Sequence, residues 1–105
     1  MEFDYRVAVA KAAKADLMEI DNYIAIELNS PMAAANFADA VEKNLGSLSF
    51  SPHGHPKVRD DRLAAKGYRW IGIKNYTAFF TIDEQSKTVN VERILYGRRD
   101  WQRIL

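Results

Sequence analysis

The residues best suited to chemistry lie close to the end of the sequence, in the segment RILYGRRDW, residues 93–101. Three arginines, a tyrosine and a tryptophan fall within these nine positions, and Arg103 follows with only Asp100 opposing the group. Guanidinium groups keep their charge at any physiological pH and bind phosphate or carboxylate oxygens through a planar fork of donors. The segment therefore predicts a site for an anionic partner, provided that the fold holds the arginines in place.

Charge is distributed unevenly along the chain, although the net charge is only +1. The first 52 residues hold four Lys or Arg and eight Asp or Glu, which gives −4. Residues 53–105 hold eleven and six, which gives +5. Such asymmetry indicates a polyanionic partner for one face. A solvated surface whose charges cancel is the alternative.

Composition is that of an ordinary soluble globular protein, and 105 residues suffice for one hydrophobic core, so we expect a single domain over residues 1–105. No apolar run approaches the ~18 residues of a membrane span. The acidic start and the absence of cysteine predict a cytoplasmic protein without thiolate chemistry. His53 and His55 lie two apart in a Pro/Gly loop without a third ligand, so we expect exposed histidines and neither metal nor cofactor.

The first half of the chain reads as a strand followed by two helices. Residues 2–9 alternate between apolar and other side chains, which predicts a strand. Apolar residues then recur three and four apart over residues 11–28, which predicts an amphipathic helix. Ser30 can cap the next helix and Pro31 fits its first turn, so a second helix should run to about Leu48. Two helices joined so closely form an antiparallel hairpin.

The second half reads as three strands. Residues 51–56 contain two prolines and a glycine and predict a loop. Strands follow over residues 67–74, 76–82 and 88–96, and a short terminal helix should begin at about Arg98. The order β-α-α-β-β-β predicts an α+β fold in which the helical hairpin packs on a mainly antiparallel, twisted sheet.

Alternation along the strands predicts which side chains face the helices. Those expected in the core are Tyr76, Ala78, Phe80, Ile82, Val89, Val91, Leu95, Ile71 and Ile73. Those expected on an open, basic face are Trp70, Lys74, Thr77, Phe79, Thr81, Asn90, Glu92, Ile94 and Tyr96. Trp70 could stack on a base there, cover a sheet edge or meet a partner. Arg69 and Arg93 share the parity of buried residues, so each should end a strand or pair with an acid, while Trp101, Ile104 and Leu105 should anchor the terminal helix.

The element order, together with GYRWIGIKNY, YTAFFTID and above all ERILYGRRDW, resembles the RelE/ParE superfamily of toxins from bacterial toxin–antitoxin modules. The helical half, with AKADLMEIDNYI and a Ser-Pro before the second helix, is similar to that family too. The resemblance covers essentially the whole chain.

 The C-terminal segment carries most of this likeness, and the helical hairpin carries least.

The resemblance implies a growth-inhibiting toxin that a cognate antitoxin neutralises and that is a monomer or weak dimer when alone. RelE-like members cleave messenger RNA on the ribosome, and ParE-like members inhibit DNA gyrase by binding without catalysis. A non-toxic relative that only binds a partner is a third alternative. The three stay open at this point.

RNA cleavage through the 2′-hydroxyl needs a base, cations around the phosphorane and an acid for the leaving oxygen. By the resemblance, Arg98 and Arg99 stand where RelE-like ribonucleases place a phosphate-stabilising basic residue, and Lys74 can join them. Tyr96 and Glu92, which share strand parity, are the nearest candidates for proton transfer, because arginine serves poorly as an acid or base.

Two departures weaken the ribonuclease interpretation. Those nucleases have an arginine after the tyrosine that leads the middle strand, where this chain has Thr77 after Tyr76. Their terminal helix carries a catalytic tyrosine, whereas this tail reads WQRIL, residues 101–105. Gyrase inhibition needs only an interaction surface, so neither departure counts against it.

Overall fold

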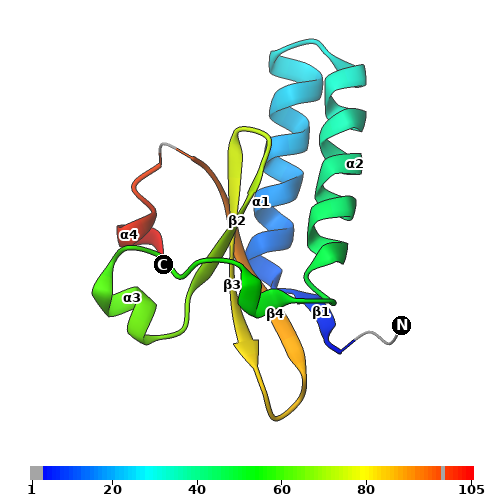
Figure 1. The fold of residues 1–105 in the computed structure, drawn as a ribbon. Coiled ribbons are helices and arrows are strands. Elements are labelled where there is room, and N and C mark those ends of the chain that lie inside the picture. The colour runs from blue at the N-terminus through cyan, green and yellow to red at the C-terminus, as the bar shows by residue number, and fades with distance from the viewer. Residues whose placement is uncertain (1–3, 98) are drawn as a thin grey trace.

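The computed structural model describes residues 4–97 and 99–105. It consists of a four-stranded sheet with helices on both sides (Figure 1). The strands are β1 (Arg6–Val9), β2 (Arg69–Ile73), β3 (Tyr76–Asp83) and β4 (Thr88–Tyr96), in the order β1-β4-β3-β2. β1 runs parallel to β4, and the other pairs are antiparallel. The α+β class and the mainly antiparallel sheet are therefore as predicted. β1 begins at Arg6 rather than at residue 2, and residues 1–3 lie outside the described part.

The predicted helical hairpin is formed by α1 (Lys11–Asn22) and α2 (Pro31–Ser47), which stand side by side in Figure 1. Ser30 caps α2, because its Oγ accepts a hydrogen bond from the Ala33 amide at 3.2 Å, and Pro31 occupies the first turn. Between the helices, η1 (Tyr23–Glu27) is a π-helical turn in which the Leu28 amide donates to the Tyr23 carbonyl. The expectation of α-helix up to Leu28 is thus wrong in its last turn, because the chain widens before it reverses.

The main core fills the space between the hairpin and one face of the sheet. Ile20 of α1 and Phe37 and Leu45 of α2 form one cluster with the apolar side chains on the face of the sheet that is turned toward the hairpin. Its buried members are Ala13, Ile20, Ile24, Ala34, Phe37, Leu45, Leu48, Ile71, Ile73, Ala78, Phe80, Val89, Val91 and Ile94. The predicted packing of the hairpin on the sheet is confirmed.

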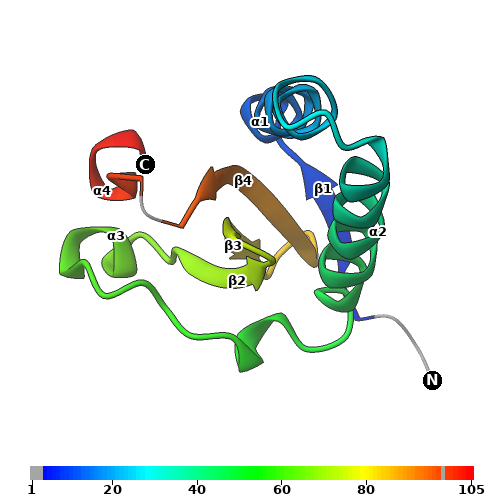
Figure 2. The ribbon, with the colours of Figure 1, turned by 90° about the horizontal axis from the view of Figure 1, so that it is seen from above.

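The opposite face of the sheet is covered where Phe79 and Leu95 lie, so the expectation of an open basic face is wrong for that part. The short helices α3 (Asp61–Ala65) and α4 (Trp101–Ile104) lie on the side of the molecule remote from α2 (Figure 2). A second cluster forms there from Val58, Leu63, Phe79 and Leu95, with Trp101, Ile104 and Leu105 packed against it. The prediction that these three terminal residues anchor the chain end is confirmed, although α4 begins at Trp101 rather than near Arg98.

Sequence periodicity missed α3 because five residues are too few to show a helical repeat. Its ends carry local signals. The Asp60 carboxylate accepts from the Leu63 amide at 3.1 Å at the start. Gly67, with φ of +91°, permits the reversal after the helix, where the Tyr68 amide donates to the Leu63 carbonyl.

A β-bulge explains why two neighbouring side chains are exchanged between the faces. Phe79 pairs with Arg93 while Phe80 pairs with Val91, so Glu92 is an extra residue in β4. Beyond it the alternation is shifted by one position. Ile94, expected on the open face, is therefore in the main core, and Leu95, expected against the hairpin, is in the second cluster.

A polar cluster at the β3–β4 turn ties this turn to the chain before β1 and to the loop containing η2 (Pro52–Gly54). The Glu84 carboxylate accepts hydrogen bonds from the Tyr5 hydroxyl at 2.8 Å and from Lys87 Nζ at 3.2 Å, and it pairs with His53 Nε2 at 2.9 Å. The hydrogen bond from Tyr5 is the largest cause of a lowered pKa of Glu84, and Lys87 adds to it.

Replacing Tyr5 with phenylalanine should raise the pKa of Glu84 toward its ordinary value, because the strongest donor is removed. A carboxyl whose pKa is lower in the folded than in the unfolded chain stabilises the fold fully above the unfolded pKa, and this contribution is lost as pH falls through the lowered value. Acid should therefore loosen the turn at a higher pH in Tyr5→Phe than in the wild type. NMR titration of the Glu84 carboxyl carbon measures the shift, and equal pKa values in both proteins would contradict it.

Candidate functional site

A cleft of about 460 Å³ opens where α1 and η1 pass the ends of β3 and β4. We call it the tyrosine cleft. Its polar and aromatic lining consists of Asp16, Glu19, Tyr23, Tyr76, Tyr96 and Arg99. Ile20, Ile94 and Leu95 supply the apolar part of the wall. The cleft thus combines three aromatic rings with charged groups of both signs.

The tyrosines come from three separate elements. Tyr76 and Tyr96 are cross-strand partners of β3 and β4, and their ring centroids lie 5.7 Å apart at 76°. The Phe37 ring of α2 packs on Tyr76 from another side, with 5.1 Å between the ring centroids. Burial raises the pKa of Tyr76, and the nearby Tyr23 and Tyr96 phenols raise it further, so its hydroxyl remains protonated. Tyr23 and Tyr96 are about half exposed and can meet a partner.

Asp16 holds the wall of the cleft together. Its carboxylate accepts from Arg93 Nε at 2.7 Å, from Arg93 Nη2 at 2.9 Å and from the Ile94 amide at 2.9 Å. β1 pairs with β4 only as far as Val91, so Asp16 takes the place of a neighbouring strand beyond that point. The hydrogen bond to Asp16 is the largest cause of a raised pKa of Arg93. The Asp16 carboxylate is therefore engaged in these structural hydrogen bonds and is not available for proton transfer.

The predicted acid partner of Arg93 is confirmed, but the sequence did not identify it as Asp16. A signal was present, because Asp16 stands three residues after Ala13 and four before Ile20, within the apolar stripe of α1. A buried acid on such a stripe needs a cationic partner from elsewhere in the fold.

Residues 7–101 match the family of the ParE toxin of the type II toxin–antitoxin system, parDE. The chain belongs to the ParE toxin family. Among solved structures, a chain of the chromosomal ParDE TA system from P. aeruginosa is similar, with a TM-score of 0.72 and 16% identity, over 90% of this chain and 98% of that one. A chain of the toxin–antitoxin complex RelBE2 from Mycobacterium tuberculosis has a TM-score of 0.61 and 22% identity, over 89% and 98%. No curated protein sequence matches.

In this ParE-family toxin the predicted site residues do not come together as one group. Tyr96 and Arg99 line the tyrosine cleft. Glu92 lies apart from it and accepts a hydrogen bond from the Thr81 hydroxyl at 2.9 Å. Lys74 is exposed in the β2–β3 turn, where its φ is +57°, and Arg98 lies outside the described residues.

The expectation that Tyr96 and Glu92 share one side of β4 is wrong, because the bulge at Glu92 shifts the alternation between them. Tyr96 instead meets Tyr76 beside the hairpin. Sequence reasoning also missed Tyr23 and Glu19, which the hairpin brings to the cleft from the first quarter of the chain.

Arg69 has the structural role that was predicted. It begins β2, and its Nη1 donates to the His55 carbonyl at 2.7 Å and to the His53 carbonyl at 3.3 Å. Within residues 4–97 and 99–105, no cluster of three or more His, Cys, Asp or Glu side chains is arranged to hold a metal ion. The same residues include no helix with the length and apolar character needed to cross a membrane.

Proposed function

We propose that this ParE-family toxin inhibits growth in the cytoplasm by binding DNA gyrase through the tyrosine cleft, without catalysing a reaction. The observation that supports this most directly is the composition of the cleft, where two half-exposed tyrosines and Arg99 surround a partly buried tyrosine. Tyrosine and arginine are the residue types that dominate the binding energy of protein–protein interfaces. The separation of Glu92 from Tyr96 and Arg99 also favours binding over RNA cleavage.

Ribosome-dependent cleavage of messenger RNA is the second candidate, and Glu19 gives it a specific basis. Glu19 is an exposed carboxylate in the lining of the cleft that also contains Tyr96 and Arg99. In that alternative Glu19 would remove the 2′-hydroxyl proton as the 2′-oxygen bonds to phosphorus, and Arg99 would stabilise the phosphorane. Tyr96 would donate a proton to the 5′-oxygen as its bond to phosphorus breaks. Tyr96 and Arg99 can serve either activity, whereas only RNA cleavage needs the Glu19 carboxylate.

We also propose that a cognate antitoxin neutralises the toxin with an extended or helical C-terminal segment. A groove of about 270 Å³ between α1 and α2 is lined by Leu17, Met18, Phe37 and Val41, together with Asp21 and Ala38. The Met18 side chain is 69% exposed, which leaves an apolar surface for the anchors of such a segment. Alone, the toxin should be a monomer or a weak dimer.

Replacing Tyr96 with alanine should raise the toxin concentration that half-inhibits gyrase by about tenfold or more, because a hot-spot side chain contributes about 2 kcal/mol. Tyr23→Ala should act in the same direction. Gln85→Ala, in the exposed β3–β4 turn, serves as the matched control and should inhibit like the wild type. The measurement is DNA supercoiling by purified gyrase with increasing toxin.

Three results would separate the candidates. Unchanged supercoiling in excess toxin would overturn gyrase as the target. Cleavage of messenger RNA on translating ribosomes that Glu19→Gln abolishes would establish the ribonuclease instead. Induced expression without growth arrest would indicate a non-toxic relative, whereas arrest that the protein encoded next door relieves would support the toxin–antitoxin module.

A further inference from the structure

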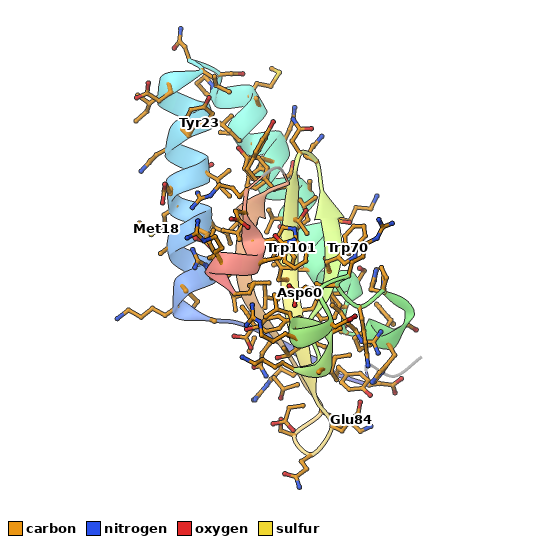
Figure 3. The ribbon with its side chains drawn as sticks, turned by 90° about the vertical axis from the view of Figure 1, so that its left-hand side faces the viewer. Met18, Tyr23, Asp60, Trp70, Glu84 and Trp101 are labelled. Atoms are coloured by element: carbon orange, nitrogen blue, oxygen red, sulfur yellow. The ribbon has the colours of Figure 1, made fainter. Side chains whose placement is uncertain are left out.

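The free end of the helical hairpin carries apolar side chains that the proposed function does not explain. Eight large hydrophobic side chains are exposed among the described residues, and four of them lie within residues 23–32. We call these four, Tyr23, Ile26, Leu28 and Met32, the tip patch. Figure 3 shows Tyr23 near this end of the hairpin and Met18 farther along α1. Single exposed apolar residues are ordinary, but such a concentration marks a surface for contact with another molecule.

The turn between α1 and α2 directs these side chains into solvent. In η1 the Leu28 amide donates a hydrogen bond of 3.1 Å to the Tyr23 carbonyl. Of residues 23–28, only Ile24 is buried, and its side chain belongs to the main core. Asn29 then reverses the chain with φ of +48°, a conformation that asparagine adopts more readily than most residues. The outward position of Leu28 is therefore fixed by a hydrogen-bonded turn.

The tip patch is accessible and separate from the surfaces already described. Figure 1 shows the hairpin extending past the end of the sheet, with its turn as the outermost part. The patch shares no residue with the groove between α1 and α2, and it shares only Tyr23 with the tyrosine cleft. Its use by a partner therefore does not depend on gyrase being the target of the toxin.

The charges of the hairpin limit what can meet the patch. The sequence between Lys14 and Lys43 contains six Asp or Glu and no Lys or Arg. Two hairpins lying side by side would therefore bring like charges together. Within residues 22–32 the only charged residue is Glu27, so contact between the two ends avoids most of this repulsion. The basic half of another copy is a poor match, because its cations would lose water against apolar side chains with one carboxylate to pair with.

The area of the tip patch suits a weak contact between two copies. Met32 is 76% exposed, Ile26 70%, Leu28 55% and Tyr23 50%. Four large side chains exposed to this extent offer roughly 500 Å² of accessible surface, near the upper end of the largest apolar patch on a monomer. Two such patches would bury about 1,000 Å² in total, which is the lower limit for a specific interface and below the ~1,600 Å² of a standard one. The expected dimer is therefore reversible and forms at micromolar concentration.

We propose that the tip patch is a self-association surface, through which two copies of the toxin meet end to end about a two-fold axis. In such an isologous contact the patch of one copy covers the same patch of the other. Apolar side chains then leave water together, which supplies the driving force. The acidic flanks of the two hairpins remain in solvent.

Sedimentation velocity of the purified toxin from about 5 to 500 µM tests the proposal, because an interface of this size is half-formed within that range. The wild type should pass from monomer to dimer as the concentration rises. Ile26→Glu and Met32→Glu should each weaken dimerisation at least tenfold, since each places a carboxylate in an apolar contact. Met18→Glu alters a methionine that is 69% exposed but lies outside the patch, so it should dimerise like the wild type. Circular dichroism verifies that the variants are folded.

Cross-linking distinguishes an end-to-end contact from a head-to-tail one. The chain contains no cysteine, so an introduced thiol reports on a single position. Glu27→Cys should be joined rapidly into a covalent dimer by a short bismaleimide, because the two-fold axis brings this position of both copies together. Gln85→Cys, in the exposed β3–β4 turn, should react with the same reagent but form far less dimer. Added salt should not weaken the dimer, because the two Glu27 carboxylates repel each other and salt screens them.

A wild type that stays monomeric over the whole concentration range would overturn the proposal. Unchanged dimerisation in both Ile26→Glu and Met32→Glu would overturn it as well, because the contact would then lie elsewhere on the molecule. If salt weakens the dimer and Glu27→Cys is cross-linked no faster than Gln85→Cys, the acidic hairpin contacts the basic half of the other copy and the end-to-end arrangement is wrong. None of these outcomes requires that gyrase be the target.

Discussion

Asp16→Ala should lower the free energy of unfolding by about 3 kcal/mol. The change leaves the Arg93 guanidinium and the Ile94 amide without the acceptor that now takes 2.7, 2.9 and 2.9 Å hydrogen bonds from them. The cost is large because the Asp16 side chain is only 11% exposed and water replaces the lost bonds poorly. Urea denaturation followed by circular dichroism measures it.

Two controls distinguish this effect from a general effect of altering α1. Asp21→Ala removes an exposed acid from the same helix and should change stability by no more than about 0.5 kcal/mol. Asp16→Asn keeps an acceptor oxygen of similar size but removes the charge, so it should fall between Asp16→Ala and the wild type. Equal, small losses for Asp16→Ala and Asp21→Ala would mean that the bridge between α1 and β4 contributes little.

Phe79→Ala should cost about 3–5 kcal/mol, close to the cost of Phe80→Ala. The two neighbours point to opposite faces of β3, and both are buried, at 3% and 0% exposure. Phe79 also supports Trp101, so the truncation should loosen α4 and increase proteolytic cleavage in residues 97–101. Denaturation curves and limited proteolysis measure the two effects.

This comparison tests the covered far face of the sheet directly. On an open face, loss of the Phe79 ring would change stability by only about 0.5 kcal/mol. Trp70→Ala is a suitable reference on the same face, because Trp70 is 40% exposed and its truncation should cost less than that of Phe79. A cost for Phe79→Ala no greater than that for Trp70→Ala would contradict the second cluster.

The helical hairpin and the succession of helices and strands along the chain could be predicted because their signals are local. The apolar repeat of α1 and α2 and the Ser30-Pro31 start are contained in short windows of sequence. The faces of β4 could not be predicted throughout, because one extra residue at Glu92 reverses every side chain that follows it. Nothing in the alternation of apolar residues announces such an insertion.

The candidate site was predictable only in part, for a related reason. Tyr96 and Arg99 belong to the C-terminal segment that the sequence singled out, and both line the tyrosine cleft. Glu19 of α1 and Tyr23 of η1 reach the same cleft from positions more than 70 residues earlier in the chain. Asp16, the partner of Arg93, lies 77 positions before it. A single sequence does not contain the pairing that brings such distant residues together.

The parallel pairing of β1 with β4 has a consequence for how the toxin matures. Arg6 pairs with Thr88 and Val9 with Val91, so the first strand cannot find its place in the sheet until most of the chain has been made. Closing so long a loop is slow compared with forming the local β2–β3–β4 meander. We therefore expect β1 and α1 to dock last, and the tyrosine cleft, which needs both ends of the chain, to be completed only at that step. On the function proposed above, a nascent toxin would therefore stay inactive until this last docking step.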